Sequence, residues 1–438
     1  MLKPHKTPRP LAASPVYLAA SAINSLRRVL PASTGYFIGI VLITMFTGQL
    51  GHHQGSLARA ALPYVIHLRW GWHRVERAME RGQVSLDTLF ERAVTWCLAS
   101  LPVEPVRLGS EQRTVHAVDS STIARLRANP HRSARLGKGD CHRAQRAVQA
   151  NLVAVLTTVV LIAGVRVGLV RRTRFGATCQ EAVAQVCADL PVSPEKRLFS
   201  VDAGIATIEQ FRAATAQDAL VGRLRKNVTL RQAPPPKPAG TRGRPKLHGP
   251  VLHPGAKHPE APPDEDTTIR IEDREVRVRR WRNLHFRQTP QTLMDVVRVD
   301  DPAYKRPLLI GTTARELTTD EIRAAYRHRW PVETNFYVAQ DTCAMEMPRA
   351  WTATAVERRI SLALLAGSLL KAIAAACPPL PMGPWDLKAV SSAGRLANHL
   401  ALHAKHFAAL ALKGCAPRMY RKILDPNETK TLPLPLAA

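Results

Sequence analysis

A proline-dense segment at residues 234–263 constrains this chain more than any other feature, because it holds 10 of the 34 prolines. Proline has no backbone N–H and clashes with the preceding helical turn, so regular helices and central strands do not survive that density. Four glycines in the same segment add further permissive backbone positions. The segment is therefore predicted to be a linker or a loop-rich insertion that divides the regular part of the chain in two.

The part of the chain before this segment has the pattern of a mixed α/β fold. Two short β-rich runs, residues 114–118 and 197–201, are each followed directly by an aspartate, Asp119 and Asp202. The order strand, hairpin, helix, strand predicts a mixed sheet with flanking helices. The other predicted elements are a buried hairpin from residues 153–159 and 161–170, and a helix at residues 180–188.

Charge indicates the class of partner. The chain has 62 Lys and Arg against 34 Asp and Glu, a formal net charge of +28, and 47 of these cations are arginines. Arginine grips phosphate oxygens in pairs through its guanidinium fork, so a nucleic acid is the expected partner. The alternative is a basic enzyme whose charge serves only solubility. With 45% hydrophobic residues, the chain is too apolar to be a disordered basic tail.

The remaining patterns suggest five parts. Residues 1–105 have helical spacing with interspersed arginines, which suits a DNA-binding domain, with a dimerisation layer as the alternative. The later strands are predicted at residues 268–271, 276–278, 294–299 and 307–312, and the later helices at 320–330, 331–345 and 355–375. The expected division is a helical DNA-binding domain (1–105), a first core part with both aspartates (106–230), a Pro-rich and β-rich insertion (231–300), a second core part (301–376) and a C-terminal helical tail (377–438).

Cysteine usage and apolar runs bear on the compartment. The seven cysteines include no Cys-x-x-Cys pair, which predicts reduced thiols in a cytoplasmic protein. The apolar runs at residues 36–46 and 151–165 are shorter than the roughly 20 residues that span a membrane, so both are expected to be buried core. No membrane insertion is predicted.

A helical segment near residue 330 carries the third acid of a candidate metal site. Tyr326, Arg329, Glu333, Tyr337 and Gln340 are spaced +3, +4, +4 and +3, which places them on one helix face. Pro331 is expected to start that helix in its first turn or to kink it. With Asp119 and Asp202 at a sheet edge, Glu333 completes three carboxylates for Mg²⁺, for which Mn²⁺ can substitute. A pair of such ions stabilises the attacking and leaving oxygens of a phosphodiester displacement.

These residues resemble those of the DDE transposases of bacterial insertion sequences, in the branch with the Tyr-x2-Arg-x3-Glu-x6-Lys signature. Tyr326, Arg329 and Glu333 match its first three positions, whereas the signature lysine falls on Gln340. Residues 118–122 are similar to the first aspartate motif of the family, and residues 201–204 with 221–225 are similar to the second. The resemblance spans about residues 110–375.

The resemblance implies an RNase H-like catalytic core with Asp119, Asp202 and Glu333 as metal ligands. Arg329 would bind a phosphate and Tyr326 would position the terminal nucleotide, while Gln340 would contact DNA without the charge of lysine. The implied reaction is hydrolysis at transposon ends and 3′-OH attack on target DNA, by a homodimer on double-stranded DNA in the bacterial nucleoid. A catalytically inactive DNA-binding derivative and an RNase H-like nuclease without strand transfer are the alternatives.

Three weaker signals each have an alternative interpretation. The family's β-rich insertion can hold a tryptophan that stacks on an unpaired base, and Trp281, beside several arginines, is either that residue or part of the insertion's core. Arg242 and Arg244, in Arg-Gly-Arg-Pro, resemble a minor-groove hook, or else lie in a solvated loop. The last signal, His399, His403 and His406, is expected to be surface histidines rather than a zinc site.

Overall fold

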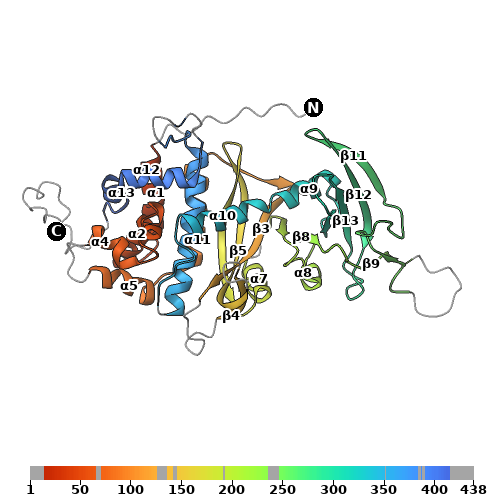
Figure 1. Ribbon diagram of the computed structural model, residues 1–438, viewed down its shortest axis with the longest axis horizontal. Coiled ribbons are helices and arrows are strands. Elements are labelled where there is room, and N and C mark those ends of the chain that lie inside the picture. Colours follow the sequence, from red (N-terminus) through yellow and green to blue (C-terminus); the bar gives the residue numbers. More distant parts are fainter. Residues whose placement is uncertain are drawn as a thin grey trace, which may run out of the picture.

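The protein has an α/β fold built around one 12-stranded mixed sheet (Figure 1). The computed structural model describes residues 14–65, 71–125, 136–141, 146–190, 193–234, 246–350, 352–382, 386 and 390–414. Helices from the two ends of the chain lie together at one end of the molecule, and the last strands of the sheet lie at the other. Two short strands, β9 (Leu230–Arg231) and β10 (Val251–Leu252), form a separate ladder.

Five strands at the centre of the sheet carry two of the candidate acids. In spatial order they are β6 (Val165–Gly176), β5 (Arg146–Ile162), β3 (Arg113–Ala124), β7 (Arg197–Val201) and β8 (Asp218–Leu224). The pairs β6–β5 and β5–β3 are antiparallel, whereas β7 runs parallel to β3 and β8 runs parallel to β7. The helices α7 (Cys179–Ala188) and α8 (Ile208–Ala213) connect β6 to β7 and β7 to β8. Three short strands also join the sheet: β1 (Val103–Pro105) and β4 (Gly137–Cys141) pair with β5, and β2 (Arg107–Leu108) pairs with β3.

The predicted hairpin and helix are confirmed, but one strand boundary was wrong. β5 and β6 are joined at Ala163 and Gly164, both with positive φ, as a two-residue hairpin turn requires. β3 does not end at Val118, because β5 continues to pair with it as far as Ala124. Asp119 therefore lies inside a strand rather than after one.

The strands predicted after the proline-dense segment are confirmed, and they continue the central sheet. They are β11 (Glu265–Ile271), β12 (Arg274–Leu284), β13 (Met294–Asp300) and β14 (Leu308–Thr312). Each pairs antiparallel with the next, and β14 pairs antiparallel with β8, where Leu309 lies opposite Leu224. Residues 265–312 are thus hydrogen-bonded to the central strands through β14.

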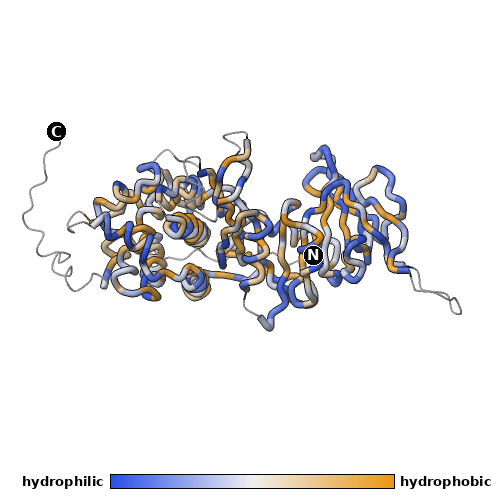
Figure 2. Tube along the Cα trace, turned by 90° about the horizontal axis from the view of Figure 1, so that it is seen from below, coloured by the Kyte–Doolittle hydropathy of each residue, from blue (hydrophilic) through white to orange (hydrophobic). Residues whose placement is uncertain are grey.

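The N-terminal residues are helical, as predicted, and pack with the C-terminal helices into one apolar core. Figure 2 shows the hydrophobic residues of these helices and of the central strands running through the interior. The N-cap residue Ser85 accepts a hydrogen bond from the Thr88 N–H at the start of α6. The helices are α1 (Pro15–Arg27), α2 (Ala32–Phe46), α3 (Gln49–His52), α4 (Leu57–Val65), α5 (Gly71–Arg81), α6 (Leu86–Ser100), α11 (Ala353–Ala376), α12 (Ala393–Leu402) and α13 (Ala404–Ala411).

The apolar stretches of the chain are buried. Residues 36–46 lie in the buried α2, and most of residues 151–165 lie in β5. Length and composition alone would allow α11 to cross a membrane, but 89% of its most apolar window is buried inside the described part of the chain. That burial is typical of the central helix of a folded core.

Candidate active site

Asp119 and Asp202 lie next to each other where the parallel ladder of β3 and β7 ends. The last pair in that ladder is Val118 opposite Val201, and each aspartate is the next residue. Both valines are buried on the side of the sheet that α7 covers. Because side chains alternate along a strand, Asp119 points to the opposite face of the sheet, where the later helices pack.

The helices on that face meet in an elbow above the two aspartates. α9 (Thr319–Arg327) begins with a capping box between Thr318 and Glu321 and packs on β7, β8 and β14. α10 (Trp330–Asp341) packs on β3, β5 and β6 and has Pro331 in its first turn, as predicted. Arg329, between the helices, keeps a helical backbone (φ −68°, ψ −36°). Tyr326, Arg329 and Glu333 therefore share one face across the elbow.

The elbow brings these three side chains onto the carboxylates. The Tyr326 hydroxyl donates a hydrogen bond to Asp202 Oδ1 at 3.1 Å. Arg329 Nη1 lies 3.6 Å from Asp119 Oδ2 and also donates to Glu333 Oε1. The Arg329 guanidinium additionally lies over the Tyr326 ring, at 5.5 Å from its centroid. All five residues predicted to form the core of the site are thus in one cluster.

Burial and like charges raise the proton affinity of Asp119. Burial raises the pKa of Asp119 to about 6, although the Ser120 N–H, 2.8 Å from Oδ1, and the Arg329 guanidinium both oppose the shift. The negative charges of Glu333 and Asp202 raise this pKa further. The ionised form of Asp119 is therefore stabilised by a cation nearby, such as the Arg329 guanidinium.

The pKa values of Arg329 and Tyr326 are also shifted by burial and by the neighbouring charges. Burial alone would lower the pKa of Arg329, but the hydrogen bond to Glu333 and the neighbouring negative charges outweigh it and raise the pKa. Burial also raises the pKa of the Tyr326 phenol, so its proton stays in place to donate to Asp202. In this arrangement Arg329 is the internal cation of the carboxylate cluster.

The carboxylate oxygens of Asp119, Asp202 and Glu333 are the kind of ligand that a hard divalent cation binds. Mg²⁺ prefers carboxylate oxygens, and the effect of Glu333 and Asp202 on the pKa of Asp119 shows that the three charges lie within electrostatic range. As arranged, Arg329 lies against Asp119 and Glu333, and no group of three His, Cys, Asp or Glu among the described residues is close enough to hold an ion. Metal binding would therefore require Arg329 to release these acids.

The other residues on the predicted helix face lie farther along α10. Tyr337 is 66% exposed and Gln340 is partly exposed, and the structure gives neither a contact with the carboxylates. Arg242 and Arg244 lie outside the described residues. These residues remain sequence predictions. Two of the three histidines predicted to be on the surface, His399 and His403, contact each other edge to face with their ring centroids 4.8 Å apart.

The base-stacking prediction for Trp281 was wrong, and its alternative holds. Trp281 is 1% exposed, and its indole N–H donates to the Ala261 carbonyl at 3.1 Å. A side chain with both faces packed and its only donor satisfied offers no surface to a base. Trp281 is a core residue of β12, in the same apolar cluster as Phe211 of α8.

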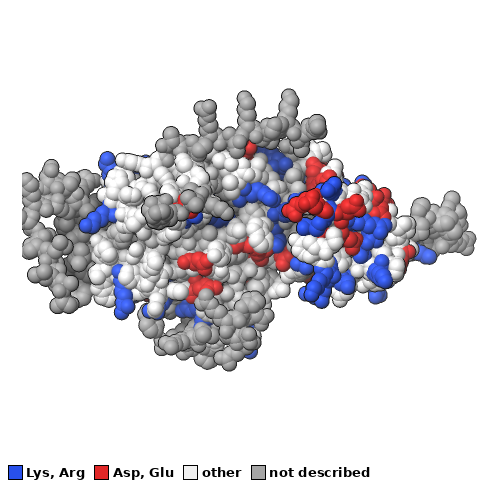
Figure 3. Space-filling view, turned by 45° about the horizontal axis from the view of Figure 1, so that its top comes forward, with Lys and Arg blue, Asp and Glu red and all other residues white. Residues whose placement is uncertain are grey.

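The arginines around Trp281 are paired with acids. Figure 3 shows Lys and Arg gathered over the lobe of β11–β13 together with Asp and Glu, so this face carries both signs of charge. Arg280, which is 1% exposed, binds Asp295 at 2.6 Å. The other ion pairs there are Arg277–Asp266, Arg279–Asp300 and Arg282–Glu265. These cations stabilise the lobe and are poorer phosphate ligands than the sequence suggested.

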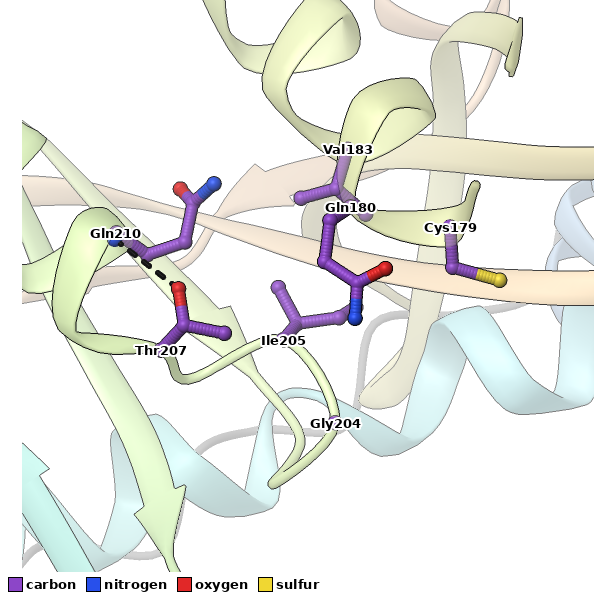
Figure 4. Close-up of a pocket in the computed structure, with 7 residues that line it drawn as sticks. All are labelled: Cys179, Gln180, Val183, Gly204, Ile205, Thr207 and Gln210. Atoms are coloured by element: carbon purple, nitrogen blue, oxygen red, sulfur yellow. Dashed lines mark hydrogen bonds between the residues drawn. The ribbon is translucent and has the colours of Figure 1, made fainter. Parts of the chain in front are cut away.

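A small pocket lies behind the loop that follows Asp202. Figure 4 shows its lining: Cys179, Gln180 and Val183 from α7, and Gly204, Ile205, Thr207 and Gln210 from the loop and α8. The Asp202 carbonyl accepts hydrogen bonds from the Ile205 and Ala206 N–H groups, which fixes the turn after the aspartate. None of the described lining residues is acidic or basic, so the pocket adds no charge to the carboxylate site.

Sequence reasoning missed two residues beside the cluster. Trp330, the first residue of α10, is 62% exposed although it is large and apolar. Lys371, on α11, donates hydrogen bonds to the first turn of α10. The exposure of Trp330 has no sequence signal. Lys371 does have one, since it is the only charged residue of α11 beyond Arg359.

No protein-family model matches the chain, and the curated proteins include no match to it. The class of protein therefore has to be inferred from the geometry of the site itself.

Proposed function

We propose that this protein is a metal-dependent DNA transposase of the DDE type. The observation that carries the proposal is the cluster of Asp119, Asp202 and Glu333 with Tyr326 and Arg329. These residues come from three separate segments of the chain and meet in one cluster.

The central strands support an RNase H-like core for this proposal. An antiparallel set β6–β5–β3 is followed by β7 and β8 in the direction of β3, with helices on both faces. Asp119 and Asp202 then lie at the end of the parallel ladder, where ligand sites of open α/β sheets form.

Each residue has a proposed role. Asp119, Asp202 and Glu333 would hold Mg²⁺ or Mn²⁺, which polarises the scissile phosphate and lowers the pKa of the attacking water or 3′-OH. Arg329 would transfer its guanidinium from the acids to a DNA phosphate, to which it can donate two hydrogen bonds. Tyr326 would hold Asp202 in position and lie beside the terminal nucleotide.

DNA is the proposed partner. The net charge of +28 supports strong phosphate binding. Arginines of the β11–β13 lobe that are paired with acids contribute less to it. We assign contact with transposon ends to the N-terminal helices and assembly on two ends to a homodimer. Both assignments rest on the resemblance.

Two alternatives to the proposal are an inactive DNA-binding derivative, suggested by Gln340, and a nuclease that lacks strand transfer. Glutamine in place of the signature lysine removes one positive charge beside the DNA, which favours a DNA-binding protein that has lost catalysis. An RNase H-like nuclease would cut DNA with metal and would not join the ends to a target. Metal-dependent cutting of DNA would rule out the inactive DNA-binding protein. Joining of the cut ends to a target would rule out the nuclease.

The test is a cleavage assay with the full chain and a plasmid that carries its own gene and native flanking DNA. With Mg²⁺ or Mn²⁺, the proposal predicts cuts at two defined flanking sites and joining of the released ends to a second plasmid. Glu333→Gln should abolish both reactions and leave DNA binding intact, because it removes a metal ligand and no cation. Tight binding to the flanks without cutting under either metal would refute the proposal in favour of the inactive derivative.

A further inference from the structure

We propose that Lys371 is a positioning residue that holds the first turn of α10, and with it Glu333, against the sheet. The proposal rests on the function proposed above for Glu333. It concerns a residue outside the carboxylate cluster, on a different helix and 38 positions further along the chain.

Lys371 binds three acceptors within one helical turn. Its Nζ donates to the Pro331 carbonyl at 3.1 Å, to Asn335 Oδ1 at 3.0 Å and to Thr334 Oγ1. The three acceptors flank Glu333 on both sides in sequence. An ammonium has three donors, so this set satisfies it completely and ties it to a single geometry.

The contact extends into the sheet. Asn335, which is fully buried, donates from Nδ2 to the Gly168 carbonyl of β6 at 2.8 Å, and Ser368 of α11 donates to the same carbonyl at 3.0 Å. α10, α11 and β6 thus share one closed network of hydrogen bonds. Because each of these polar groups has a partner, the network rigidifies the elements that it joins.

A lysine at position 371 carries an energetic cost, which its hydrogen bonds to α10 would have to offset. Lys371 is itself half-buried, and this burial lowers its pKa to about 7. A positive charge beside the N-terminal turn of a helix also opposes the helix dipole. An apolar residue would fill the same space without either cost, but it could not fix the first turn of α10.

The first test is hydrogen–deuterium exchange of the full-length protein, without metal or DNA, in peptides covering residues 330–341. Lys371→Met keeps the length of the side chain and removes its donors, and we expect exchange in the first turn of α10 to become about tenfold faster. Lys371→Arg should restore most of the protection. Lys405→Met, at an exposed lysine on α13, is the matched control and should leave these peptides unchanged.

A second variant guards against global destabilisation. Thr334→Val is nearly isosteric and removes one acceptor from the α10 side, so it should accelerate the same peptides by a smaller factor. Rates within twofold of wild type in both Lys371→Met and Thr334→Val would overturn the proposal. An equal acceleration of exchange in peptides of α12 and α13 would also overturn the proposal, because it would show that the substitution destabilises the whole protein.

The second test uses the reaction. Since Lys371 does not face the carboxylate cluster, Lys371→Met should lower kcat for cleavage about tenfold with KM within twofold, and Lys371→Arg should recover most of it. If the wild type cuts no DNA while the exchange result stands, the proposed function fails and the positioning role holds. Unchanged exchange together with normal cutting by Lys371→Met would overturn the positioning role and leave the proposed function standing.

Discussion

Replacing Arg329 by glutamine should tighten the binding of divalent cations to the metal-free protein. Arg329 Nη1 lies 3.6 Å from Asp119 and also binds Glu333, so the substitution removes the internal cation from two carboxylates. At 3.6 Å and an effective dielectric constant of about 20, one such charge pair is worth about 4.6 kcal/mol. If solvent leaves only a third of that, the pKa of Asp119 still rises by about one unit.

The same change alters stability as a function of pH. Unfolding returns the pKa of Asp119 from about 6 to an ordinary value of about 3.9. The folded state holds this proton more tightly, so the contribution of Asp119 to stability is greatest below about pH 4 and falls by up to about 3 kcal/mol as the pH rises to 6 and above. In Arg329→Gln the fall should be larger and should continue to about pH 7.

The assay is thermal unfolding of wild type, Arg329→Gln and Arg327→Gln in EDTA from pH 5 to pH 8, followed by titration with Mn²⁺ at pH 7.5. Arg327 is an exposed cation at the end of α9, so its substitution removes the same charge from the protein without touching the cluster. We expect Arg329→Gln to bind Mn²⁺ about tenfold more tightly than wild type, and Arg327→Gln to bind as wild type does. Equal or weaker binding by Arg329→Gln, or a pH profile that matches wild type, would refute the counter-ion role.

Three further results are expected. Glu333→Gln should abolish metal-dependent cutting while DNA affinity in a gel-shift titration stays within about twofold; parallel losses would contradict its assignment as a ligand. Tyr326→Phe removes the hydrogen bond to Asp202, and isothermal titration should show Mn²⁺ binding several-fold weaker, with unfolding changed by about 1 kcal/mol. Trp281→Ala should lower the free energy of unfolding in urea by about 3–5 kcal/mol, and a selective loss of DNA affinity at full stability would restore the stacking hypothesis.

Local patterns in the sequence predicted the elements that local physics determines. The β-branched hairpin, the helix start at Pro331 and the spacing of Tyr326, Arg329 and Glu333 are set by residues close in the chain, and all were predicted correctly. The extent of β3 was not, because β5 pairing through Asp119 is a non-local interaction.

In the candidate site, too, the contacts between distant segments could not be predicted from the sequence. Three acids were recognisable from their contexts, but the pairing of Arg329 with two of them depends on where the helix elbow lies above the sheet. Trp281 could be either exposed or buried as long as only its arginine neighbours were known, since their acidic partners lie on other strands. Lys371 acquires its role only from the packing of α11 on α10.

The antiparallel pairing of β8 with β14 has a consequence for how such a chain can diversify. Leu224, near the end of β8, lies opposite Leu309, near the start of β14, so the chain leaves the central sheet and returns to it at adjacent points. The returning strands β13 and β14 pack against α9, and the lobe shares an apolar core with that helix, so the residues between β8 and β14 support one arm of the elbow. Diversification of the lobe is therefore restricted to residues that do not contact α9, because a shift of β13 or β14 would move the helix that carries Tyr326.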